Sequence, residues 1–233
     1  MKLLFAANLK GRRDLYETLV ARSPEFTAMF WIGDLIDPDG DDAAEQQARL
    51  ESAAGEIQAR GCRVIASGAS ASSLDLWRWF DRQGMFVAPG LLITGHPERE
   101  DRSRLSALRE AASKAGALWI ALADAHASLA HTTEVPGGNY RGAYAADRFA
   151  PDLIVTTAAD GARHRGHEWC QRRAHTWVLV PDAGDPHAAS HVILDLRRRR
   201  AVRHSRAGRE SRDLSALFRA RFDAHDSPLQ LAA

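Results

Sequence analysis

The segment Met29-Phe30-Trp31-Ile32-Gly33-Asp34-Leu35-Ile36-Asp37 decides the fold of this chain. Four apolar residues run into a glycine, and two aspartates follow at a spacing of three. A short apolar run that ends at a glycine is typical of a buried strand, which we expect over residues 28–32. Side chains that follow such strands lie where α/β sheets hold their ligands.

Outward from this segment, apolar runs of strand type alternate with stretches of helical periodicity. We expect strands over 3–7, 28–32, 63–66, 91–94, 118–123, 153–156, 176–180 and 191–196, and helices over 12–22, 41–60, 74–83, 102–115, 142–149 and 214–222. Alternating strands and helices predict an α/β fold.

Three further segments place small or polar residues at the ends of expected strands. They are MKLLFAANLKG at 1–11, CRVIASGAS at 62–70 and PDLIVTTAADG at 151–161. The order and spacing of all four segments resemble the calcineurin-like metallophosphoesterases. In that family the segments normally read Asp-x-His, Gly-Asp-x-x-Asp, Gly-Asn-His and Gly-His-x-His, and only the second is intact here.

The resemblance implies an α/β sandwich of two facing sheets flanked by helices. It covers residues 1–205 as a metallophosphoesterase-like domain. Residues 206–233 would then be a C-terminal extension with an amphipathic helix.

The resemblance also implies a site that has lost most of its metal ligands. Asn8 stands at the family's Asp and Lys10 at its His, while Asp34 would be the bridging carboxylate and Asp37 a supporting residue. The remaining positions of this vestigial site are Ala69, Ser70, Asp124, Ala158 and Asp160. A shift of two residues would put His126 in the place of Asp124.

A binuclear phosphoesterase needs two dications, each with about four to six nitrogen or oxygen ligands. Too few ligands remain, so we expect no catalytic residues and no metal cofactor. The alternative is a single Mg²⁺ or Mn²⁺ held by Asp34, Asp124 and Asp160, with Asn8 adding a carbonyl oxygen.

The Lys10 ammonium would repel such an ion. One hypothesis is that Lys10 replaces the metal's positive charge and binds the clustered carboxylates directly. The other is that Lys10 points into solvent from its loop.

Composition narrows the class of protein. With 233 residues, 45% hydrophobic and 26% charged, the chain is typical of a globular protein. We expect no membrane-spanning segment, because no run of 18 apolar residues occurs. Two cysteines give no disulfide framework, so a cytoplasmic location is expected. A net charge of +1 argues against a positive electrostatic field over the whole chain of the kind that attracts nucleic acid.

Arginines gather at one place, Arg197, Arg198, Arg199 and Arg200. They allow contact with phosphate groups of a nucleic acid or with an acidic protein. The alternative, which we favour, is that Arg198 and Arg199 turn a hairpin between strands 191–196 and 201–205.

Two apolar features are candidates for contact with another chain. Trp77, Trp79 and Phe80 share an expected helix, and Trp77 and Trp79 cannot lie on one face of it. The second feature is the face of helix 214–222 that carries Leu214, Leu217, Phe218 and Phe222. That helix either packs on its own domain or docks a partner.

Two functions follow. The first is a catalytically degenerate metallophosphoesterase-fold protein, a pseudoenzyme that serves as a scaffold or interaction subunit for a protein partner or a second copy of itself. The alternative is a divergent phosphoesterase that hydrolyses phosphate esters at a rebuilt, single-metal site. A fold alone does not carry an activity, so the site must decide between them.

Overall fold

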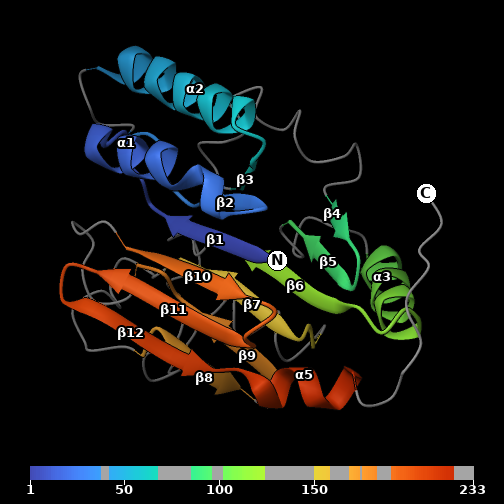
Figure 1. Cartoon of the computed structure of the whole chain (residues 1–233). Helices are drawn as coiled ribbons and strands as arrows, with labels where there is room; N and C mark the ends of the chain where they lie inside the picture. The colour runs from blue at the N-terminus through green and yellow to red at the C-terminus, as the bar shows by residue number, and fades with distance from the viewer. Residues whose placement is uncertain are drawn as a thin grey trace, which may run out of the picture.

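Two six-stranded sheets face one another in this computed structural model, with helices on their outer faces (Figure 1). The structure describes residues 1–37, 42–67, 85–95, 102–123, 150–157, 168–173, 175–182 and 190–222. The α/β sandwich of two sheets flanked by helices that the sequence predicted is confirmed.

Sheet A has the strand order β12-β11-β10-β1-β2-β3, and sheet B the order β4-β5-β6-β7-β9-β8. The strands of sheet A are β1 (Lys2–Ala7), β2 (Ala28–Ile32), β3 (Arg63–Ser67), β10 (His191–Asp195), β11 (Arg200–Ser205) and β12 (Gly208–Asp213). Those of sheet B are β4 (Met85–Ala88), β5 (Leu91–Thr94), β6 (Leu118–Ala123), β7 (Leu153–Thr156), β8 (Cys170–Arg173) and β9 (Thr176–Leu179). The helices are α1 (Arg13–Arg22), η1 (Ser23–Glu25), α2 (Ala43–Ala59), α3 (Arg102–Lys114) and α5 (Ser215–Phe222).

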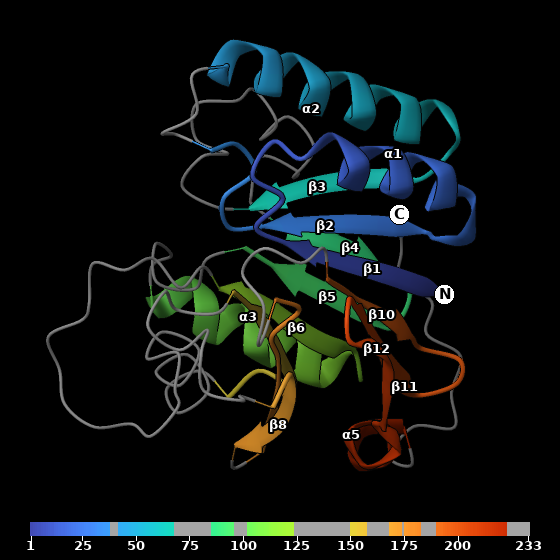
Figure 2. The same ribbon diagram turned by 90° about the vertical axis from the view of Figure 1, so that its left-hand side faces the viewer.

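Successive side chains of a strand point to opposite faces of its sheet, and this alternation explains the layers of the fold. Leu3 and Phe5 of β1 and Phe30 of β2 join the core between the two sheets. Their neighbours Leu4 and Trp31 point the other way, into the core beneath α1 and α2. Both faces of β1 and β2 are therefore buried, which explains why these strands read as unbroken apolar runs. Figure 2 shows α1 and α2 over sheet A, and α3 on the outer side of sheet B.

Strands β1, β2 and β3 are parallel, and so are β5, β6, β7 and β9. Their carboxyl ends in each sheet lie at a common edge, where α/β folds place ligands. Within the parts of the chain that the structure describes, no helix is long and apolar enough to cross a bilayer.

The hairpin expected around Arg198 and Arg199 is confirmed, because β10 and β11 pair antiparallel on either side of that turn. The expected strands at 28–32, 91–94, 118–123 and 153–156 match the observed ones residue for residue. Three strands were not predicted, namely β4, β8 and β12, and each lies at the edge of a sheet.

The C-terminal region is built into the sandwich. Strand β12 pairs with β11 across six residues and so extends sheet A beyond residue 205, where we expected the main domain to end. Leu214, Leu217 and Phe218 are buried in the core between the sheets. Of the two outcomes expected for the last helix, packing on its own domain is therefore the one observed for these three side chains. They are not available to a partner, although the sequence had made them candidates for such a contact.

Candidate functional site

The loops that follow β1 and β2 continue the pairing of the two strands beyond their ends. The strands run parallel, with Ala7 opposite Ile32. Three backbone hydrogen bonds then join the loops, from Asn8 N to Ile32 O (2.9 Å), from Lys10 N to Asp34 O (3.0 Å) and from Gly11 N to Leu35 O (2.7 Å). The first two predicted site segments are therefore held side by side.

Asn8 is the central residue of this edge. Its backbone is left-handed, with φ of 52°, a region that Asn tolerates better than most residues. Its side-chain Oδ1 accepts a hydrogen bond of 2.9 Å from the backbone N–H of Asp34. Its Nδ2 donates a hydrogen bond of 2.5 Å to Oδ2 of Asp182. One amide thus connects the ends of two strands in sheet A with the segment that follows β9 of sheet B.

Gly33 lets the two sheets approach each other at this point. Its φ is +79°, and a Cβ atom there would lie 2.3 Å from Asn8 Oδ1 and 2.7 Å from Thr157 Cγ2. Thr157 directly follows β7, so three strand ends of both sheets converge on Asn8 and Gly33. A side chain at position 33 would push them apart.

Asp182 is buried and lies near Arg203 of β11, which is also buried. Burial lowers the pKa of Arg203, and the charges of Glu210 and Asp182 oppose that shift. Nη1 of Arg203 lies 3.3 Å from Oε1 of Glu210, and Nε1 of Trp169 donates to Oε2 of the same carboxylate at 3.1 Å. Polar and charged side chains thus follow one another from Asn8 towards β12, with the charge of Asp182 acting on Arg203.

Gln46 of α2 fixes the loop that carries Asp37. Its Oε1 accepts a hydrogen bond of 2.7 Å from the backbone N–H of Asp37, and its Nε2 donates one of 2.7 Å to Asp42. A Cβ atom on Gly11 would lie 2.0 Å from Gln46 Oε1, so the loop after β1 lies flat against the same side chain. Asp37 thus takes part in the site through its backbone.

Lys10 is half-buried, and its backbone is also left-handed, with φ of 46°. Asp34 is the one expected partner of Lys10 that lies within the described residues. Asp124 and Asp160, the other expected partners, lie outside the described residues.

Several further predictions also fall outside the described residues. They concern Ala69, Ser70, His126, Ala158, Trp77, Trp79 and Phe80. Among the residues that are described, no three His, Cys, Asp or Glu side chains are grouped closely enough to hold a metal ion.

The four arginines lie at and after the turn between β10 and β11. Arg198 pairs with Asp195 at 3.8 Å, and Oδ1 of Asp195 accepts the backbone N–H groups of Arg197 and Arg198 at 3.1 Å each. Arg200 begins β11 opposite Asp195.

Sequence reasoning missed Asp182 and Gln46. Asp182 follows an expected strand by two residues, so the rule that sites lie at strand ends would have included it. The only sequence signal for Gln46 is its position four residues after Asp42, on one face of a helix.

Comparison with known proteins bears on the fold alone. No protein-family profile matches this sequence, and no curated protein matches it either. The structure is similar to that of a dimetal phosphatase from Danio rerio, with a TM-score of 0.59 at 10% identity, over 91% of this chain and 98% of the other. It is also similar to the protein TT1561 of Thermus thermophilus, with a TM-score of 0.55 at 17% identity over the same shares.

A third similar structure is the purple acid phosphatase PPD1 from seeds of yellow lupin, Lupinus luteus. The TM-score is 0.56 at 10% identity, over 100% of this chain and 57% of the lupin protein. Such low identities carry a statement about architecture and none about activity. This chain has the fold of the calcineurin-like metallophosphoesterases.

Proposed function

We propose that this chain is a catalytically degenerate metallophosphoesterase-fold protein that acts as an interaction subunit for another protein. The observation that supports this most is the side chain of Asn8. Its amide bonds to the backbone of Asp34 and to the carboxylate of Asp182, at the edge where the fold family holds its metals. A hydrogen bond between protein groups thus connects the two sheets at this edge.

The described residues fit a two-metal centre poorly. One lone pair of Asn8 Oδ1 is taken by the N–H of Asp34, and the Nδ2 donor faces Asp182. An amide offers no negative charge, and the ammonium of Lys10 in the same loop offers no ligand atom. Asp34 is the one family ligand retained among the described residues, and one carboxylate cannot hold two dications.

The interaction role rests on Trp77 and Trp79. Tryptophan is enriched among the residues that contribute most to protein interfaces. Two residues apart on the helix that the sequence predicts, these indoles would point in different directions, which would leave at least one available to a partner. The partner is another protein or a second copy of the chain.

Metal content and activity test the first half of the proposal. Protein purified without chelators is analysed for Mn, Fe, Zn and Mg, and assayed on bis(p-nitrophenyl) phosphate beside Asp34→Ala. We expect less than one metal per chain and equal rates for both proteins. Two metals per chain, or a rate that Asp34→Ala abolishes, would rule the proposal out.

Co-purification tests the second half. Trp77→Ala and Trp79→Ala are compared with the unaltered protein, and Val87→Ala is the control because Val87 is an exposed apolar residue on β4. We expect at least one Trp variant to lose the partner or the dimer while remaining folded, and the Val87 variant to keep it. If all three variants retain the same partners at the same mass, the interface lies elsewhere.

A divergent phosphoesterase is the second candidate, and Asp182 favours it. The fold brings this carboxylate to Asn8, whose other amide atom contacts the backbone of Asp34. Two carboxylates and an amide oxygen resemble the oxygen donors that Mg²⁺ and Mn²⁺ prefer. If this candidate is right, Asp34→Ala and Asp182→Asn each lose one bound equivalent of Mn²⁺ in equilibrium dialysis.

A further inference from the structure

A hollow of about 290 Å³ opens at the end of the sandwich opposite the candidate site. It is lined by Met1 before β1, Leu118 at the start of β6, Leu196 after β10 and Phe218 of α5. Leu118 and Phe218 are buried core residues, so the hollow opens directly onto the core between the sheets. Its size is at the lower end for small-molecule sites, about 300–1,000 Å³.

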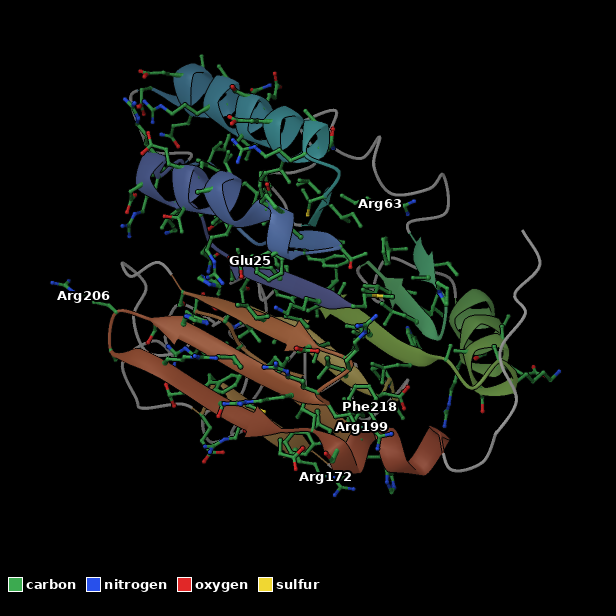
Figure 3. All side chains as sticks on the ribbon, viewed as in Figure 1. Glu25, Arg63, Arg172, Arg199, Arg206 and Phe218 are labelled. Carbon is green, nitrogen blue, oxygen red and sulfur yellow. The ribbon has the colours of Figure 1, made fainter. Side chains whose placement is uncertain are left out.

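Pro89, Gly90 and two arginines, Arg197 and Arg199, complete the lining. Neither guanidinium forms an ion pair or a side-chain hydrogen bond with any residue that the structure describes. Arg198, between them, points elsewhere and pairs with Asp195 at 3.8 Å. The wall of the hollow is therefore mainly apolar, and beside it lie two guanidinium groups that form no ion pair with a described residue. Figure 3 shows Arg199 and Phe218 on the same side of the molecule, next to α5.

The turn that carries these arginines is held in place from both sides. Oδ1 of Asp195 accepts the N–H groups of Arg197 and Arg198, each at 3.1 Å. Arg199 has φ of 51°, and its carbonyl accepts a hydrogen bond of 2.7 Å from the N–H of Leu214, directly before α5. The backbone is thus ordered before any ligand arrives, which lowers the entropy lost on binding.

We propose that this hollow binds a medium-chain fatty carboxylate, with the chain against Leu118, Leu196 and Phe218 and the head group on Arg197 and Arg199. Guanidinium groups hold a carboxylate by paired charge-assisted hydrogen bonds. A hollow of this volume accepts one chain of moderate length and excludes a large cofactor. The site lies apart from Asn8 and Asp34, and it does not depend on whether the chain is an enzyme.

Titration calorimetry of the full chain with carboxylates from butanoate to decanoate tests the proposal. We expect saturable one-to-one binding of octanoate, with affinity rising about fourfold per added methylene until the hollow is full. Acetate, which has the charge alone, and octanol, which has the chain alone, should each bind at least about tenfold more weakly than octanoate.

Arg197→Gln and Arg199→Gln should each weaken octanoate about fivefold to tenfold. Arg198→Gln is the matched control, because it lies in the same turn but outside the hollow, and it should change the affinity less than about twofold. All three positions are on the surface turn, so thermal unfolding should show folded proteins. Methyl resonances of Leu118 and Leu196 should shift on binding.

The proposal is overturned by any of three results. These are no saturable binding of octanoate below its micelle concentration, an affinity independent of chain length, and an Arg198 variant that loses as much as the other two. The last result would mean that net charge attracts the ligand and that the hollow does not hold it.

Discussion

The side-chain amide of Asn8 donates a hydrogen bond of 2.5 Å to a carboxylate oxygen of Asp182, 174 residues further along the chain. The same amide accepts the N–H of Asp34 at 2.9 Å. Asn8 follows β1 of sheet A, and Asp182 follows β9 of sheet B. The contact therefore links the two layers at the edge where parallel strands of both sheets end.

Asn8→Asp, which restores the family's residue, should destabilise the metal-free protein. It would put two carboxylates in contact, and the pKa of one of them must rise. We expect a loss of about 1–3 kcal/mol in the free energy of unfolding at pH 7. The raised pKa means that this loss shrinks as the pH falls and one carboxyl takes up a proton. Urea unfolding at several pH values measures it.

The double variant Asn8→Asp with Asp182→Asn is the control for that experiment. It exchanges the carboxylate and the amide, so a donor again faces an acceptor. It should recover more than half of the lost stability. A double variant no more stable than Asn8→Asp would show that the pair does not act through this hydrogen bond.

Gly33→Ala should lower stability more than an alanine at another left-handed glycine. The Cβ atom would lie 2.3 Å from Asn8 Oδ1 in addition to the strain of a φ of +79°. Gly61→Ala is the matched control, since Gly61 has φ of +83° and nothing within 4 Å of the added atom. We expect Gly61→Ala to lower the free energy of unfolding by about 1–2 kcal/mol, and Gly33→Ala to lower it by at least about 2 kcal/mol more. Equal losses would mean that Asn8 can move aside.

Acid should destabilise the protein through His191. Its ring stacks on His204 with centroids 5.0 Å apart, and its Nε2 accepts a hydrogen bond of 2.8 Å from Nη1 of Arg22. Burial, followed by the charges of Arg22 and His204, lowers the pKa of His191 from 6.5 to about 4, against a smaller opposing effect of Glu25. The folded state thus favours the neutral ring.

The sign of the pH effect follows from proton uptake. In the unfolded chain His191 binds a proton below pH 6.5, whereas in the folded chain it does so only near pH 4. Stability from His191 is therefore present above pH 6.5 and falls towards pH 4, by up to about 3 kcal/mol. Unfolding curves of His191→Gln should lose that part of the pH dependence, and those of the exposed His175→Gln should keep it.

Leu217→Ala should show that the last helix is part of the fold. Leu217 is buried in the core between the sheets. We expect a loss of about 2–4 kcal/mol in chemical unfolding. Its neighbour Ala216 is exposed, so Ala216→Ser should change stability by less than about 0.5 kcal/mol. If Leu217→Ala left the free energy of unfolding unchanged, the last helix would again be a candidate for contact with a partner.

Much of the fold could be predicted because its signals are local. The run Leu118–Ala123 is apolar at every position, and such a run is buried on both faces wherever it folds. The edge strands were harder. Strand β12 reads Gly-Arg-Glu-Ser-Arg-Asp with all six residues exposed, and it is a strand because the backbone of β11 pairs with it. A strand held mainly by its neighbour's hydrogen bonds leaves little trace in its own residue pattern.

The sequence by itself determined the alternation of strands and helices and the position of Asn8, Asp34 and Asp37 after buried strands, because backbone periodicity and strand ends are properties of neighbouring residues. Three features were decided by the tertiary structure alone. Asp182 accepts a hydrogen bond from the side-chain amide of Asn8, and Gln46 accepts one from the backbone N–H of Asp37. Leu217 and Phe218 are buried in the core between the sheets. Each of these depends on how one layer lies on another. Contacts between layers join residues far apart in the chain, and their partners are set by the packing of the whole domain.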